Sequence, residues 1–128
     1  MKIKILIPVY NDWPSVSKLI DKINEQSISP EFQISIIIIN DASNYDRQDE
    51  EKNLDNIDSI KILNMKKNQG HARCIATGLK YIYEKEDFDY AIPMDGDGED
   101  RPEEIKLFIE NFNYHPNRTI VGERTKRS

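Results

Sequence analysis

Acidic side chains alternate with glycines in the segment Asp95-Gly96-Asp97-Gly98-Glu99. Glycine has no side chain, so a ligand can approach the backbone closely at these positions. Carboxylate oxygens are the ligands that Mg²⁺ and Mn²⁺ prefer, and Mg²⁺ is usually held by one or two carboxylates together with phosphate and water oxygens. A cation bound in this way neutralises the charge that develops on a diphosphate when its bond to a sugar breaks. The segment is therefore a candidate site for Mg²⁺ or Mn²⁺.

A calcium-binding EF-hand loop is one alternative for an acidic segment of this kind. That loop requires a glycine at its sixth position, where this chain has Asp100, and a bidentate glutamate at its twelfth, where it has Lys106. An apolar, strand-like run also precedes the segment, whereas a helix precedes an EF-hand loop. The EF-hand is therefore excluded. The alternative that stays open is a solvated acidic turn that binds nothing.

Two other polar segments also come at the end of an apolar run. Residues 8–12 end the run that begins at residue 2, and residues 40–43 follow the isoleucine-rich run at 34–39. Each segment alone is a weak signal, because Asn, Asp and Ser are ordinary turn residues. If the apolar runs are parallel strands of one sheet, the three segments indicate one shared site.

Strand-like and helix-like segments alternate along the whole chain. Short β-branched runs predict strands, and apolar residues spaced i, i+3, i+4 and i+7 predict amphipathic helices. Asp12 is a candidate helix cap, and Pro14 suits the first turn of the helix that follows. The polar stretch at 41–58 is expected to be a surface loop. Strands are expected at residues 2–9, 34–39, 59–63, 89–94 and 119–122, and helices at residues 16–23, 72–82 and 105–112.

This alternation predicts an α/β fold with a mostly parallel sheet and helices on its faces. Right-handed crossovers between the strands then follow. In such sheets, ligands bind beyond the carboxyl ends of the strands, near a switch in strand order. The three polar segments are therefore expected to meet at one edge of the sheet.

The composition is that of an ordinary soluble domain. The 128 residues are 38% hydrophobic and 32% charged, and we expect one domain over residues 1–128. The net charge of −5 argues against nucleic acid as a partner, because phosphate binding requires clustered Lys and Arg. No run reaches the ~20 apolar residues of a membrane span. The expected location is the cytoplasm, with a peripheral position at a membrane surface left open.

Two residues with reactive side chains have an ordinary structural explanation. Cys74 is the only cysteine, which excludes a disulfide framework, and a buried position in the core is the default for it. His71 lies at the predicted start of a helix, where we expect a hydrogen bond, and contact with a ligand is the alternative.

Four motifs, in order along the chain, resemble those of inverting family-two glycosyltransferases of the GT-A fold. Residues 8–12 are similar to the opening motif of that family, residues 39–43 to its second-strand motif, usually Asp-Asp-Gly-Ser, and residues 68–72 to its Asn-x-Gly stretch. Residues 93–105 resemble the Asp-x-Asp segment of the branch that makes polyprenyl-phosphate sugars, including dolichol-phosphate mannose synthases. The resemblance implies a three-layer, Rossmann-like GT-A fold, truncated after about the fifth strand, that binds a nucleotide-diphospho-sugar.

The resemblance also implies which residues surround the nucleotide. Pro8, Tyr10 and Asp12 would line the nucleotide pocket, with Asp12 standing where Glu is commoner. Ile39 and Asp41 would contact the base or the ribose. The donor would be a UDP- or GDP-linked sugar.

For the diphosphate and the metal, the resemblance implies a second group of residues. Asp95 and Gly96 would lie against the diphosphate and the sugar. Asp97 and Glu99 would reach Mg²⁺ or Mn²⁺, with Asp95 as a further metal ligand. Arg124 falls where the synthase branch keeps an arginine for the diphosphate, and a planar guanidinium suits that task.

The chain departs from the family pattern in three ways. Asn40 replaces the first Asp of the second-strand motif, and Ala42 replaces its Gly. Family members also usually continue for roughly another hundred residues, within the usual size of a single domain. That half supplies acceptor contacts and, in many members, a catalytic Asp base, so the catalytic residue here stays unknown. Whether the chain works with a second copy or with a separate second half is left open.

The expected activity is transfer of the sugar, with inversion, to a polyprenyl phosphate or a saccharide. A lipid phosphate is already anionic and needs no protein base, whereas general-base help for a sugar hydroxyl is worth about 10² to 10⁴ in rate. A non-catalytic module that binds nucleotide sugars is the alternative. A sugar nucleotidyltransferase is disfavoured, because residues 8–12 lack the glycine-rich, basic loop that this class of enzyme needs.

Overall fold

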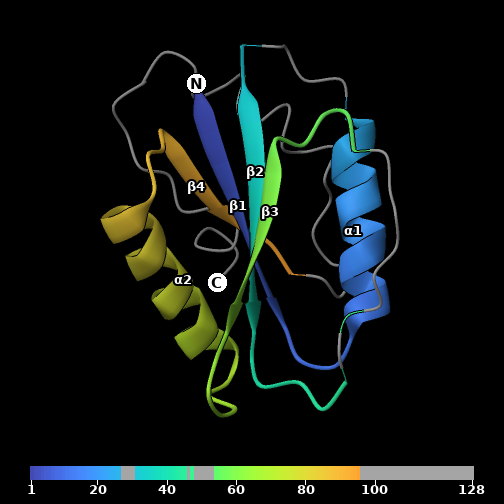
Figure 1. Cartoon of the computed structure of the whole chain (residues 1–128), viewed down its shortest axis with the longest axis vertical. Helices are drawn as coiled ribbons and strands as arrows, with labels where there is room; N and C mark the ends of the chain where they lie inside the picture. The colour runs from blue at the N-terminus through green and yellow to red at the C-terminus, as the bar shows by residue number, and fades with distance from the viewer. Residues whose placement is uncertain (27–30, 46, 48–53, 96–128) are drawn as a thin grey trace, which may run out of the picture.

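Strands and helices alternate along the chain, as the sequence pattern predicts (Figure 1). The computed structural model describes residues 1–26, 31–45, 47 and 54–95. In chain order these contain β1 (Lys2–Val9), α1 (Trp13–Glu25), β2 (Gln33–Asn40), β3 (Ser59–Asn64), α2 (His71–Lys85) and β4 (Tyr90–Pro93). The first four predicted strands and the first two predicted helices are thereby confirmed, with small differences in their bounds. The helix predicted at 105–112 and the strand predicted at 119–122 lie outside the described residues.

The strands of the described part form one parallel sheet in the order β3-β2-β1-β4. Ile5 of β1 pairs with Ile36 of β2 on one side and with Ile92 of β4 on the other. α1 covers one face of the sheet and α2 the other (Figure 1), so the predicted three-layer α/β fold is confirmed. The chain moves outward from β1 to β3 and then returns to β4, so strand order switches at β1. Ligand sites of such sheets lie at this point.

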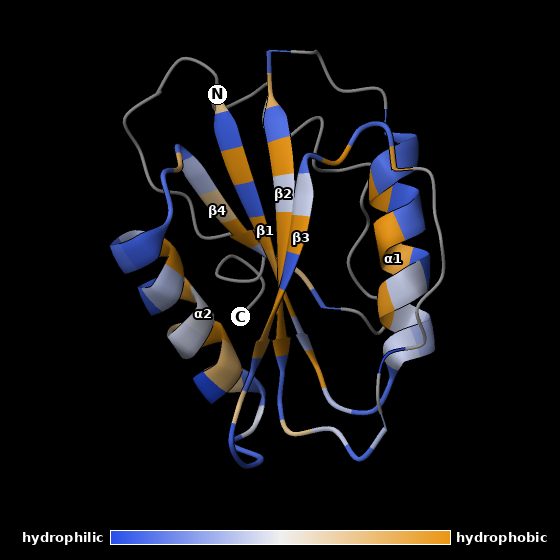
Figure 2. Ribbon diagram, viewed as in Figure 1, coloured by the Kyte–Doolittle hydropathy of each residue, from blue (hydrophilic) through white to orange (hydrophobic). Residues whose placement is uncertain are grey.

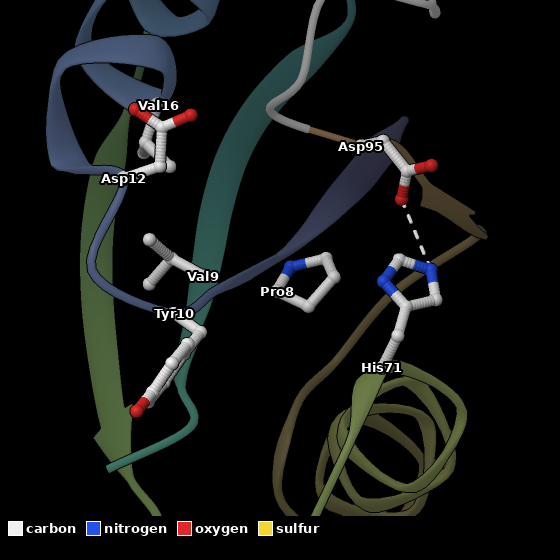
Figure 3. Close-up of a pocket in the computed structure, with 7 residues that line it drawn as sticks. All are labelled: Pro8, Val9, Tyr10, Asp12, Val16, His71 and Asp95. Carbon is white, nitrogen blue, oxygen red and sulfur yellow. Dashed lines mark ion pairs between the residues drawn. The ribbon is translucent and has the colours of Figure 1, made fainter. Parts of the chain in front are cut away.

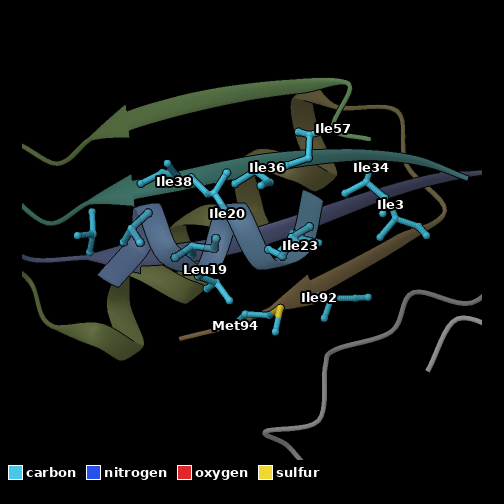
Figure 4. Close-up of a cluster of buried hydrophobic side chains, with 14 of the residues drawn as sticks. Ile3, Leu19, Ile20, Ile23, Ile34, Ile36, Ile38, Ile57, Ile92 and Met94 are labelled. Atoms are coloured by element: carbon cyan, nitrogen blue, oxygen red, sulfur yellow. The ribbon is translucent and has the colours of Figure 1, made fainter. Parts of the chain in front are cut away.

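Isoleucines make both faces of the central strands apolar. Successive side chains of a strand point to opposite faces, so Leu6, Ile37 and Ile39 pack toward α2. The alternate positions belong to the larger cluster on the α1 side (Figure 4), whose strand members include Ile3, Ile5, Ile7, Ile34, Ile36 and Ile38. Burial on both faces explains why the two runs are almost continuously apolar.

Each helix turns an apolar stripe toward the sheet and a polar side away from it (Figure 2). α1 begins after Asp12, whose carboxylate accepts a hydrogen bond from Ser15 N at 3.3 Å, so the predicted cap is confirmed. α2 lies close to the sheet at Gly78, where a Cβ would be only 2.4 Å from Leu6 Cδ1. No helix in the described ranges is long and apolar enough to cross a membrane. The buried residues of the α1 stripe are Trp13, Val16, Leu19, Ile20 and Ile23.

Candidate functional site

The ends of β1, β2 and β4 meet at one edge of the sheet. Backbone hydrogen bonding continues past the strands, because Asp41 N donates to Val9 O at 2.8 Å and Met94 N donates to Leu6 O at 2.8 Å. The segments after these three strands therefore lie side by side. The predicted convergence of the polar segments is confirmed as far as Asp95, the last described residue.

A pocket of about 170 Å³ opens at this edge (Figure 3). Its walls come from the end of β1, the start of α1, the start of α2 and the segment after β4. The structure thus brings together four residues that were predicted to bind a nucleotide sugar, namely Pro8, Tyr10, Asp12 and Asp95. Among the described residues, the lining consists of Pro8, Val9, Tyr10, Asp12, Val16, His71 and Asp95.

A smaller pocket of about 100 Å³ adjoins the first and shares part of its lining. Asp41, predicted to contact the base or the ribose, lines this second pocket together with Cys74. Tyr10 belongs to both pockets, and the residue is 48% exposed. The lining residues that the two pockets share are Pro8, Val9, Tyr10 and His71.

His71 and Asp95 form the wall between α2 and β4. His71 is the first residue of α2, and its Nε2 lies 3.0 Å from Asp95 Oδ1 (Figure 3). The Asp95 side chain is 9% exposed, whereas the His71 side chain is 53% exposed. His71 therefore has a polar partner at the start of the helix, and it also lines both pockets. The alternative that His71 contacts a ligand stays a prediction.

The buried carboxylate of Asp41 holds the segment that precedes α2. It accepts hydrogen bonds from Gln69 N at 2.7 Å, from Gly70 N at 2.9 Å and from Asn68 Nδ2 at 3.0 Å. Gly70 is the N-cap of α2, and Asp41, at another strand end, accepts from its backbone N–H and from that of the residue before it. This carboxylate therefore positions the start of α2, including His71. The predicted contact of Asp41 with the base or ribose stays a prediction.

Ile39 has a different position from the other predicted donor-binding residues. Its side chain is fully buried on the α2 face of the sheet, in the cluster that contains Leu6 and Cys74. It does not belong to the lining of either pocket. The structure therefore gives the Ile39 side chain a packing role, and its contact with a base or ribose stays a prediction.

The two departures from the family's second-strand motif have local explanations. Asn40 uses both ends of its amide, because Oδ1 accepts from Ser43 N at 3.1 Å and Nδ2 donates to Asn64 Oδ1 at 2.9 Å. An ionised aspartate could accept the first bond but could not donate the second. Ala42 has a φ of 57°, in the left-handed region that favours glycine. The backbone shape of the motif is therefore retained with an alanine in a strained position.

Asn11 ties the loop after β1 to the loop after β2. Its backbone N donates to Ser43 Oγ at 2.8 Å, and its Oδ1 accepts from Asn44 N at 2.6 Å. Asn11 has a φ of 65°, a conformation that asparagine adopts more readily than most residues. Trp13 Nε1 adds a third tie by donating to Tyr45 O at 2.8 Å. These bonds fix the loop that carries the pocket lining between β1 and α1.

Cys74 is buried, as the sequence predicts. Burial raises the pKa of its thiol to about 12, and the hydrogen bond and negative charge of Asp41 act in the same direction. The surroundings of the thiol therefore favour its protonated form at neutral pH and do not activate it as a nucleophile. In the smaller pocket it serves as a small apolar wall.

A divalent cation fits the chemistry of the larger pocket. Asp95 places a carboxylate in the pocket wall, and Mg²⁺ is usually held by one or two carboxylates with phosphate and water oxygens. Within the part of the chain that the structure describes, no group of three or more His, Cys, Asp or Glu side chains forms a metal site by itself. The predicted metal ligands Asp97 and Glu99, and the predicted donor contacts Gly96 and Arg124, lie outside the described residues.

Three of the described lining residues, Val9, Val16 and Cys74, were given no ligand contact from the sequence, and for His71 such a contact was only the alternative. Val9 and Val16 carry no chemical signal, because they continue the apolar patterns of a strand and a helix. Cys74 and His71 lie on the first turn of α2, next to the Asn-x-Gly stretch. The Asn-x-Gly stretch could have indicated these two residues, because a helix that starts at the carboxyl edge of a parallel sheet faces the ligand site.

Comparisons with known proteins support the fold and identify a family. Residues 4–128 match the family model for glycosyl transferase family 2. The crystal structure of S. aureus TarS 1-349 resembles this fold with a TM-score of 0.65 at 16% identity, over 90% of this chain and 33% of that chain. A crystal structure of S. aureus TarS matches with a TM-score of 0.64 at 16% identity, over 90% of this chain and 20% of that chain. No curated protein matches the sequence.

Proposed function

This chain belongs to glycosyl transferase family 2, and we propose that it binds the donor of an inverting glycosyltransferase, a UDP- or GDP-linked sugar, together with Mg²⁺ or Mn²⁺. One observation carries the proposal, namely the pocket at the carboxyl edge of the sheet. Tyr10 and Asp12 lie on one side of it and Asp95 on the other, with Pro8 between them (Figure 3). These residues come from segments far apart in the sequence, and each stands in a motif that resembles the family's.

We assign the two parts of the proposed donor to the two adjoining pockets. The half-exposed ring of Tyr10 offers an apolar face and a hydroxyl to the base or the ribose. Asp41 lies in the smaller pocket, and Asp95 lies in the larger one. We therefore place the nucleoside near Tyr10 and the smaller pocket, and the diphosphate and sugar toward Asp95.

The residues of this chain bind and orient the donor. Asp95, with Asp97 and Glu99 from the segment that follows, would hold the cation, and Arg124 would contact the diphosphate. When bound, the cation neutralises the charge on the departing diphosphate. Asp41 contributes indirectly, because its hydrogen bonds fix the start of α2 beside the pocket.

For the acceptor we propose a polyprenyl phosphate, since residues 93–105 resemble the synthase branch, with a saccharide as the alternative. An acceptor oxygen attacks the anomeric carbon from the side opposite the diphosphate. The new carbon–oxygen bond forms as the bond to the diphosphate breaks, so the configuration inverts. An anionic phosphate needs no protein base. Such an acceptor would place the chain at the cytoplasmic surface of a membrane.

Metal-dependent nucleotide binding tests the proposal. At a concentration of about 100 Kd, a ligand that binds only the folded state adds about 2.7 kcal/mol to the free energy of unfolding. We expect UDP or GDP, or one of their sugars, to produce this shift in thermal unfolding with Mn²⁺ and a much smaller one with EDTA. Absence of a shift with every nucleotide would contradict the proposal.

Asp95→Asn tests the predicted role of the buried carboxylate with little change in shape. Calorimetry is expected to show that Mn²⁺–nucleotide binding weakens by about tenfold or more, because a charged oxygen near the cation is lost. Asp87→Asn is the matched control, since the Asp87 side chain is 84% exposed at the opposite edge of the sheet. Binding is expected to be unchanged in the control. Equal losses in both variants would sink the assignment of Asp95.

Turnover separates a transferase from a non-catalytic binding module. Slow hydrolysis of the bound donor, detected as release of UDP or GDP, is expected from a transferase module. Its loss in Asp97→Ala would assign the reaction to the acidic segment. Tight donor binding with no release of nucleotide, even with polyprenyl phosphate present, would favour the binding module.

A further inference from the structure

The contact between His71 and Asp95 joins two parts of the pocket wall that are far apart in the sequence. α2 begins at His71, and Asp95 comes two residues after β4 ends at Pro93. His71 Nε2 lies 3.0 Å from Asp95 Oδ1, and both side chains line the larger pocket (Figure 3). The imidazole is thus a group on α2 that meets Asp95, the first residue of the acidic segment.

Both residues stand on firmly held backbone. Directly before His71, Gly70 N donates to the buried Asp41 carboxylate at 2.9 Å. Directly before Asp95, Met94 N donates to a carbonyl of β1 at 2.8 Å. Because both supports are fixed, the two side chains are held where Nε2 of His71 meets Oδ1 of Asp95.

The two side chains differ in burial, and the difference indicates their roles. The Asp95 side chain is 9% exposed, so its carboxylate depends on nearby polar atoms to offset the loss of water. His71 supplies such an atom while its own side chain stays 53% exposed. Loss of the imidazole therefore removes little buried area from the fold, but it removes a polar neighbour of Asp95.

We propose that His71 is a positioning residue, which holds the Asp95 carboxylate in the orientation that meets the donor diphosphate or its cation. The proposal rests on the proposed function, since it assigns a residue to the same donor site. Groups that orient a ligand carboxylate from behind are worth about 10- to 100-fold in metal affinity. His71 meets one oxygen of Asp95, the buried Oδ1.

Calorimetric titration of the full chain with Mn²⁺ alone, and with Mn²⁺ plus UDP or GDP, tests the proposal. His71→Ala is expected to weaken nucleotide binding by about tenfold, with little change in the midpoint of thermal unfolding. His71→Gln, whose amide N–H reaches a similar place, is expected to recover most of the affinity. Arg73→Gln is the matched control, because Arg73 is exposed on the same turn of α2 and lines neither pocket.

A double-mutant cycle separates positioning from a direct contact between His71 and the ligand. If His71 acts through Asp95, His71→Ala adds no further loss to Asp95→Asn, so the two effects are not additive. Additive losses would overturn the proposal, as would unchanged binding in His71→Ala or a His71→Gln variant that binds no better than His71→Ala. If the unmodified chain binds neither nucleotide, the proposed function fails as well, so the two failures are distinguishable.

Discussion

Acidic side chains at the two edges of the parallel sheet have different kinds of partner. At the edge where the strands begin, acids pair with lysines. Lys2 Nζ lies 2.6 Å from Asp87 Oδ2. Glu86, at the end of α2, contacts Lys61 Nζ at 2.9 Å and Lys4 Nζ at 3.5 Å. Charge at this edge serves the fold, because Asp87 and Glu86 each have a lysine of the same chain beside them.

At the edge where the strands end, buried acids contact groups of another kind. Asp41 accepts two backbone N–H groups and one side-chain amide, and Asp95 contacts the His71 ring. An amide stabilises a carboxylate through its dipole and carries no unit charge. The comparison teaches that the acids at this edge are held by amide dipoles and an imidazole, whereas Asp87 and Glu86 at the other edge are held by ammonium groups.

The largest effect is expected when Asp41 is removed. Asp41→Ala leaves the N–H groups of Gln69 and Gly70 without their acceptor, and we expect a loss of about 3 kcal/mol in the free energy of unfolding. Urea unfolding followed by circular dichroism measures it. Asp87→Ala, which removes an exposed acid at the other edge, is expected to change stability little. Similar losses in the two variants would break the comparison between the edges.

Substitution of Glu86 is expected to have an intermediate effect on the free energy of unfolding, and this effect depends on pH. Burial raises the pKa of Glu86, but the hydrogen bond from Lys61 and the charges of Lys4 and Lys61 outweigh burial and lower the pKa below its ordinary value of 4.5. Because the pKa is lower in the folded state, the stabilisation is complete above about pH 4.5 and is lost as the pH falls through the folded pKa.

Glu86→Gln is therefore expected to cost about 2 kcal/mol at neutral pH and clearly less in acid. Urea unfolding of both proteins at pH 7 and at pH 3.5 measures the difference. Glu84→Gln, an exposed change on the same helix, serves as the control. A cost for Glu86→Gln that is the same at both pH values would show that the lysines do not set the stability of this edge.

The elements of the fold were predictable because they depend on local patterns. A strand buried on both faces requires a continuous apolar run, and the isoleucines of β2 form one. The stripe of α1 has helical spacing, and Asp12 caps the helix as predicted. The strand order was not predictable in the same way. It depends on how α1 and α2 pack on opposite faces of the sheet.

The candidate site was predictable only as far as its motifs extend along the sequence. The motifs identify Tyr10, Asp12 and Asp95 as pocket residues, because polar side chains that can bind a ligand directly follow the strands there. They do not show that the side chain of Ile39 packs in the core under α2, on the same face of β2 as Ile37, and its contact with a base or ribose stays a prediction. Contacts between distant segments, such as the hydrogen bond from Gly70 to Asp41, leave no local pattern. The same holds for the contact of His71 with Asp95.

The smallest effect on the free energy of unfolding is expected from relief of backbone strain at Ala42, at the carboxyl edge. With a φ of 57°, Ala42 occupies a region that costs a residue with a Cβ roughly 1–2 kcal/mol. Glycine avoids that cost but has more freedom in the unfolded chain. Ala42→Gly is therefore expected to stabilise the protein by about 0.5–1 kcal/mol in urea unfolding.

The same substitution at Ala76 is the matched control for Ala42. Ala76 is exposed within α2, where glycine destabilises a helix by about 1 kcal/mol relative to alanine. Ala42→Gly and Ala76→Gly are therefore expected to change the free energy of unfolding in opposite directions. If both variants lose stability, the loop after β2 stores no strain at Ala42. Of the two non-glycine residues that have a positive φ in the described part of the chain, only Asn11 would then be a candidate for strain at this edge.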